Sequence, residues 1–172
     1  MGKKSIAAAF VIVGLTFSAP YVSFGQSAYD NATVSQVQQN DKLDKARVSE
    51  LMERFSKELN QPTDQEGRVL NIKDKSHLLE KFATFAEPSA VKPFINELYR
   101  QAGSKLFLKP VEGPPDFDEQ LDYDMVQLTE DRAEVKQKLN SALYGNLTMR
   151  IHFHHSEGTW KIARIQYEQA VD

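Results

Sequence analysis

The spacing of apolar residues changes once along this chain, and that change constrains the fold more than any other feature. Between residues 43 and 101, apolar side chains recur every three or four positions, which is typical of amphipathic helices. From about residue 105 onward, apolar and polar residues alternate, as they do in strands that are buried on one face. Helices therefore come first and antiparallel strands last, which predicts an α+β domain with helices packed on one face of a sheet.

Three helices are expected in the first half of the chain. They cover residues 43–59, a segment from Asp74 or Ser76 to Phe85, and residues 90–101 with Ser89 as the cap. Pro62 and Pro88 follow the first two helices, and each ends the helix before it because proline disfavours helical backbone in the preceding residue. Gly103 is the natural stop for the third helix.

The second half predicts a short strand, an irregular proline-rich loop and two hairpins. The strands are expected at residues 105–108, 123–128, 133–139, 148–155 and 159–167, with the loop at residues 110–115. A tight turn at residues 156–158 joins the last two strands. Pairing across this turn places His154 opposite Lys161, His152 opposite Ala163 and Arg150 opposite Ile165.

Composition excludes several classes of function. No cysteine occurs in the 172 residues, so a disulfide framework, a zinc–thiolate site and a cysteine nucleophile are all excluded. The chain has 21 Lys and Arg residues against 24 Asp and Glu residues, for a formal net charge of −3. Proteins that bind nucleic acids are usually basic, so we do not expect a nucleic acid as partner.

The first 25 residues predict the destination of the protein. Lys3 and Lys4 precede the uncharged apolar segment 5–19, and the small residues Ser23 and Gly25 follow it. This order of a basic start, an apolar centre and small residues is typical of a secretory signal peptide. We therefore expect cleavage after Gly25 and a secreted or extracytoplasmic protein.

The remaining chain is expected to consist of a polar linker, residues 26–42, and one α+β domain, residues 43–172. Cleavage after Ser27 is one alternative to this division. An uncleaved membrane anchor is another, because the apolar run of residues 5–24 approaches the ~17–25 residues that span a bilayer. A membrane contact is expected only through that segment.

The end of the chain resembles the last strands of NTF2-like (cystatin-like α+β) domains. The residues that carry the resemblance are Val126, Leu128, Ala133 and Val135, then Met149, Ile151 and Phe153, then Glu157, Gly158, Trp160, Lys161 and Ile162. The resemblance covers residues 43–170 and implies a long helix and shorter ones packed into the concave side of a curved sheet. That superfamily includes enzymes, scaffolds and binding modules, so the fold does not define the function. The chain also resembles small exported proteins of Gram-positive bacteria.

Four residues are candidates for the wall of a pocket. The predicted pairing puts Arg150, His152 and His154 on one strand face with Tyr167, where they could stabilise an anion or transfer a proton near neutral pH. The opposite face of the same strands is more apolar and includes Trp160. Because the more apolar face normally takes the core, we expect Trp160 to be buried and the histidines to lie outside the cone.

Neither a metal nor a cofactor is expected. His152 and His154 project from one face about 7 Å apart, but no third ligand can be placed beside them. An acidic run offers oxygen ligands for calcium at Asp116, Asp118, Glu119, Asp122 and Asp124. The run lacks the glycine and the terminal glutamate of an EF-hand loop, so we expect a solvated acidic loop.

Together these features favour an exported, non-enzymatic module that binds a small ligand or another envelope protein. One alternative is a lyase or isomerase that uses a cone pocket, with His152 or His154 as base and Arg150 as the anion partner. Another is an accessory subunit tethered to the membrane by residues 5–24. The sequence leaves open whether the protein is a homodimer.

Overall fold

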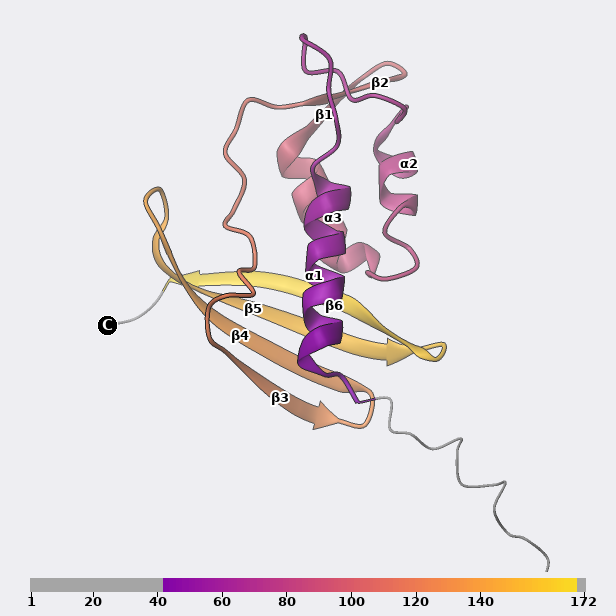
Figure 1. The fold of residues 1–172 in the computed structure, drawn as a ribbon. Helices are drawn as coiled ribbons and strands as arrows, with labels where there is room; N and C mark the ends of the chain where they lie inside the picture. Colours follow the sequence, from indigo (N-terminus) through magenta and orange to yellow (C-terminus); the bar gives the residue numbers. More distant parts are fainter. Residues whose placement is uncertain (1–41, 170–172) are drawn as a thin grey trace, which may run out of the picture. The chain divides into compact units, whose positions relative to one another are not determined.

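Helices precede the main sheet along the chain, as the apolar spacing predicts (Figure 1). The computed structural model describes residues 42–169, and the α+β class is confirmed there. The helices are α1 (Lys45–Leu59), α2 (Lys75–Glu80) and α3 (Pro88–Leu98), and the first strands are β1 (Tyr99–Ala102) and β2 (Lys105–Leu108). The main sheet contains β3 (Tyr123–Thr129), β4 (Arg132–Ser141), β5 (Gly145–Ser156) and β6 (Thr159–Gln169). The predicted signal peptide and nearly all of the predicted linker lie outside the described residues.

Helix α1 forms where the sequence predicts it. The Asp44 side chain accepts a hydrogen bond from the Arg47 amide at 2.8 Å and so satisfies one of the free N–H groups of the first turn. The helix ends at Asn60, two residues before Pro62. The side chains that α1 buries are those of the predicted stripe: Val48, Leu51, Met52, Phe55 and Leu59.

Among the described residues, no helix has both the length and the apolar character that crossing a bilayer requires.

Helix α3 begins two residues earlier than predicted. Glu87 occupies the N-cap position and Pro88 is the first helical residue, so the predicted cap at Ser89 is wrong. Proline suits this position because its fixed φ matches a helix and its missing N–H would have no partner there. The Ser89 hydroxyl instead donates a hydrogen bond to the Ala163 carbonyl at 2.9 Å, which ties the start of α3 to β6.

The end of α3 also differs from the prediction. Residues 99–102 form β1, which pairs with β2 across a turn at Gly103 (φ +58°), and do not continue the helix to residue 101. Tyr99 is fully buried, and its hydroxyl donates to the Leu59 carbonyl at the end of α1. An apolar residue at this position fits a helix and a strand equally well, which is why the apolar spacing did not distinguish them.

The main sheet is a meander in the order β3-β4-β5-β6. The predicted tight turn between β5 and β6 is confirmed, and both of its central residues, Glu157 (φ +54°) and Gly158 (φ +74°), adopt left-handed backbone. This is the geometry of a type I′ hairpin turn, whose twist matches that of the two strands. His154 lies opposite Lys161 across this turn, as predicted.

A β-bulge then changes the pairing of β5 with β6. The register shifts between Phe153, which faces Ile162, and His152, which faces Arg164, so that Ala163 is the extra residue. Beyond the bulge Arg150 lies opposite Gln166. The predicted pairings of His152 with Ala163 and of Arg150 with Ile165 are therefore wrong, because one additional residue moves every later side chain of β6 to the opposite face.

One face of the main sheet, called here the inner face, is covered by helices and contributes to the core. Its buried residues are Ala133, Val135, Gln137 and Leu139 of β4, Leu147, Met149, Ile151 and Phe153 of β5, and Trp160 and Ile162 of β6. Helix α3 packs against β6, where the Phe94 and Tyr167 rings meet edge to face at 6.4 Å. Trp160 is 3% exposed, so the prediction that it is buried is confirmed.

Candidate functional site

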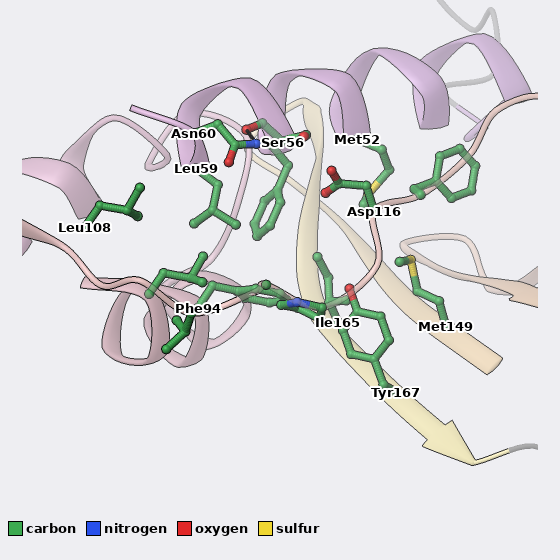
Figure 2. A pocket seen from close by; sticks show the side chains of 16 residues that line it. Met52, Ser56, Leu59, Asn60, Phe94, Leu108, Asp116, Met149, Ile165 and Tyr167 are labelled. Atoms are coloured by element: carbon green, nitrogen blue, oxygen red, sulfur yellow. Dashed lines mark hydrogen bonds between the residues drawn. The ribbon is translucent and has the colours of Figure 1, made fainter. Parts of the chain in front are cut away.

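A cavity of about 260 Å³ lies between α1, α3 and the inner face of β5 and β6 (Figure 2). Its apolar lining comes from Met52, Phe55, Leu59, Phe94, Leu98, Leu108, Val111, Gly113, Pro114, Phe117, Met149 and Ile165. Four lining residues bring polar side chains, namely Ser56, Asn60, Asp116 and Tyr167. A lining in which most residues are apolar and a few carry polar groups is typical of a site for a small molecule.

One wall of the cavity is the proline-rich loop between β2 and β3. Two aromatic side chains hold this loop in place. The Tyr167 hydroxyl, on β6, donates to the Pro115 carbonyl at 2.8 Å. Phe117, in the loop, packs edge to face against Tyr123, with ring centroids 5.2 Å apart. The loop therefore has a defined position over the sheet, although it is neither helix nor strand.

A buried amide provides a further anchor for the same loop. Gln137 is fully buried, and it is the one polar or charged residue in that class among the described residues. Its side chain accepts from the Asp118 amide at 2.9 Å and donates to the Asp118 carbonyl at 2.6 Å. Because a buried amide without partners costs free energy, Gln137 on β4 both requires the loop at Asp118 and fixes it there.

Tyr167 is a neutral hydrogen-bond donor in this site. Burial raises the pKa of its hydroxyl, and the negative charges of Asp116 and Glu97 raise it further. The group therefore stays protonated over the ordinary pH range and donates a hydrogen bond to the Pro115 carbonyl. A phenol in this state anchors the loop and is poorly suited to act as a general base.

The other three candidate residues lie on the opposite, outer face of the main sheet. His154 Nδ1 is 2.9 Å from Glu87 Oε1, and its Nε2 is 3.6 Å from Asp131 Oδ2. The side chains of His152 and His154 line a hollow of about 370 Å³ on this face. The predicted common face of these residues with Tyr167 is wrong, because the bulge at Ala163 turns Tyr167 inward opposite Met149.

Arg150 belongs to an ion-pair network on the outer face. Its guanidinium bonds both oxygens of Glu168, at 3.1 and 3.0 Å, and lies 3.0 Å from Glu134. Glu134 also contacts Lys136 at 3.0 Å and His152 Nδ1 at 3.7 Å. Burial alone would raise the pKa of Glu134, but the hydrogen bonds and charges of Lys136 and Arg150 outweigh burial and lower it. The guanidinium of Arg150 is thus already paired with two carboxylates.

Metal ligands do not gather in the part of the chain that the structure describes. Within it, no group of three or more His, Cys, Asp or Glu side chains could hold a metal ion. The side chains of His152 and His154 are directed toward carboxylates of separate elements, at Glu134 and at Glu87. A catalytic role for Arg150, His152, His154 or Tyr167 stays a prediction.

No family model matches the chain, and a search of curated proteins finds no match either. The geometry of the described residues therefore carries the functional argument.

Two residues of the site were not recognised as such from the sequence. Gln137 occupies an inward position in β4, whose other inward residues Ala133, Val135 and Leu139 are apolar. A polar residue at a position where the alternation calls for an apolar one was the sign in the sequence that could have identified it. Asp116 stood out only as one member of an acidic run. Nothing in the local sequence indicates that it faces a cavity formed by helices and strands far away in the chain.

Proposed function

We propose that this protein is an exported binding module of the NTF2-like type that holds a small molecule between its helices and the inner face of its main sheet. The observation that carries the proposal is the cavity bounded by α1, α3, β5, β6 and the proline-rich loop. A single face of one sheet, with the long α1 and the shorter α3 across the cavity from it or packed against it, supports the NTF2-like assignment. The basic, apolar and small-residue order of residues 1–25 supports export.

Binding is favoured over catalysis by the distribution of acid–base groups. The side chains of His152 and His154 are on the outer face of the main sheet, while the cavity is on its inner face. Tyr167, which does line the cavity, donates its proton to a loop carbonyl. The cavity wall therefore combines apolar contacts with hydrogen-bonding groups that orient a ligand, as binding sites do.

A cavity-filling variant tests the proposed function. Ser56 is half-buried on α1 and lines the cavity, so Ser56→Phe adds a ring to the empty space without removing a core residue. We expect small aromatic probes such as 2-phenylethanol to shift the NMR signals of Phe94 and Ile165 in the parent protein and not in Ser56→Phe. Ser76→Phe, at an exposed position of α2, is the matched control and should bind as the parent does. A parent protein whose cavity signals do not move contradicts the proposal.

Export is tested separately by the mass of the protein recovered outside the cytoplasm of a Gram-positive host. A mature chain that begins at Gln26 supports the proposal. A protein that keeps residues 1–25 and sediments with membranes supports the tethered accessory subunit instead. A full-length chain confined to the cytoplasm contradicts both.

A further inference from the structure

The cavity wall carries charge of one sign, which is negative. Asp116 is the one Asp, Glu, Lys or Arg residue among the described residues that line the cavity. Figure 2 shows its carboxylate projecting from the loop toward the space between α1 and Tyr167. Within residues 42–169, this carboxylate makes neither an ion pair nor a hydrogen bond. It is thus available to a ligand.

The surroundings of Asp116 strengthen the negative potential at this end of the cavity. A second hollow shares Met52, Ser56, Asp116 and Phe117 with the cavity and lies next to it. Its charged lining residues are Glu53, Asp116, Asp118, Glu119 and a single cation, Lys57. A cleft lined mainly by one sign of charge raises the local concentration of ions of the opposite sign.

Aromatic rings complete a site for positive charge. The side chains of Phe55, Phe94, Phe117 and Tyr167 all line the cavity. The faces of aromatic rings attract cations, and such rings are the usual surroundings of organic ammonium groups. An anionic ligand would instead bring like charge next to Asp116, and no lining Lys or Arg offsets that cost.

We propose that the cavity selects a small organic cation, with an apolar body among the aromatic rings and an ammonium group at the Asp116 carboxylate. This inference rests on the proposed binding function and names the chemical class of its ligand. The cavity of about 260 Å³ is slightly smaller than the ~300–1,000 Å³ common for ligand pockets, so the body is about the size of one ring.

Three probes with the same apolar body separate the charge of the ligand from its shape: 2-phenylethylammonium, 2-phenylethanol and phenylacetate. Affinities are measured on the full chain by NMR titration at low and at moderate salt. We expect the cation to bind about fivefold tighter than the alcohol, which is what a partly exposed ion pair contributes, and the anion to bind most weakly. The advantage of the cation should shrink as salt is added.

Asp116→Asn should abolish the preference for the cation and leave the affinity for the alcohol unchanged. Asp124→Asn removes the same charge from an exposed position on β3 that pairs with Lys136 of β4, outside the cavity lining, so it should leave all three affinities unchanged. Intermolecular NOEs in the parent protein give a second, independent readout. They should link the probe's ring to Phe94 and its amine-bearing methylene to Asp116.

The outcomes separate this inference from the proposed function. If the alcohol or phenylacetate binds as tightly as the cation, the inference is overturned while the binding module stands. If no probe binds at the cavity, both are overturned. If the two Asn variants lose affinity for the cation equally, net charge attracts the cation and the assignment to Asp116 is overturned. NOEs that place the methylene away from Asp116 overturn that assignment as well.

Discussion

The two faces of the main sheet are made by alternate residues of the same strands, yet they differ in almost every physical respect. The inner face is buried, apolar and forms one side of a cavity. On the outer face Arg150 and Glu134 are half-buried and belong to a network of ion pairs. What separates the two faces is the alternation of residues along each strand, together with the bulge at Ala163 that reverses this alternation in β6. Strand phase therefore decides which side chains reach the cavity.

The polar groups on the two faces also have different tasks. On the inner face, Gln137 and Tyr167 are neutral and bind backbone atoms of the proline-rich loop. On the outer face, Glu134 and Arg150 bind each other and neighbouring charges. Neutral groups that hold a backbone define the shape of the cavity, while ion pairs that water still reaches contribute little to stability because water and salt screen them. The four predictions below test this difference, in order of decreasing effect.

The largest effect is expected at Trp160, in the buried core. Trp160→Ala should lower the free energy of unfolding by about 3–5 kcal/mol, because a large buried side chain leaves a cavity that its neighbours only partly fill. Since Trp160 is the one tryptophan of the chain, unfolding is best followed by circular dichroism in denaturant. Gln166→Ala, exposed on the outer face of β6, should change stability by no more than about 0.5 kcal/mol. Equal losses in the two variants would contradict the division into faces.

The next largest effect is expected at Gln137. Gln137→Leu keeps a similar volume but leaves the Asp118 amide without its partner and the Asp118 carbonyl with only the Leu121 amide, which costs about 1–3 kcal/mol. Hydrogen exchange at the Asp118 amide should become faster by more than the loss of global stability explains. The exposed neighbour Lys138 provides the control variant, Lys138→Ala, in which exchange at Asp118 should be unchanged. A slow Asp118 amide in Gln137→Leu would show that the loop is held without this amide.

A smaller effect is expected at Tyr167. Tyr167→Phe removes one hydrogen bond to the Pro115 carbonyl and keeps the ring against Phe94, so the loss should be about 0.5–1.5 kcal/mol. Denaturant unfolding measures the loss, and NMR shifts at residues 113–117 report on the loop. Tyr144→Phe, which removes a hydroxyl that donates to Glu112 earlier in the same loop, provides the comparison. Loop shifts confined to Tyr144→Phe would contradict an anchoring role for Tyr167.

The smallest effect is expected on the outer face, and it depends on pH. The pKa of Glu134 lies below its ordinary value of 4.5 in the folded protein, so the unfolded chain takes up this proton first as the pH falls. The stabilisation is therefore complete at neutral pH and is lost as the pH drops below about 4.5 through the folded pKa. Glu134→Gln should cost no more than about 1 kcal/mol at pH 7 and nothing at low pH. A difference from the parent that grows on acidification would contradict the direction of this shift.

The sequence predicts the features of the fold that neighbouring residues encode, and it misses those that depend on distant parts of the chain. The stripe of α1 and the turn at Gly158 are encoded by neighbouring residues, and both are confirmed. The bulge was not predicted, because Ala163 has no property that marks an extra residue in a strand. The end of α3 was not predicted because Tyr99 fits both the three- to four-residue spacing of a helix and the alternation of a strand. Patterns of apolar residues thus locate the elements, and the register between strands depends on tertiary packing.

The site was harder to predict than the fold because its parts are distant in sequence. Its walls come from α1, α3, the loop before β3 and the last two strands. Asp116 reaches the cavity only because Gln137 and Tyr167 hold the loop over the sheet. The histidines were candidates because of their chemistry, and they lie on the outer face of the sheet, as the more apolar opposite face predicts. Chemical type alone therefore did not identify the residues that line the cavity.

The bulge at Ala163 decides which side chains of β6 form the cavity wall. Deleting Ala163 would restore ordinary pairing without exchanging the faces, because Arg164 would still lie opposite His152 and Tyr167 opposite Met149. Closing the bulge with every residue kept would instead place Ala163 opposite His152 and shift the rest of β6 by one residue. Ile165 and Tyr167 would then move to water, and Arg164, Gln166 and Glu168 would face the cavity. A relative in which this strand pairs without the bulge would therefore present a cavity wall of different polarity on an otherwise identical scaffold.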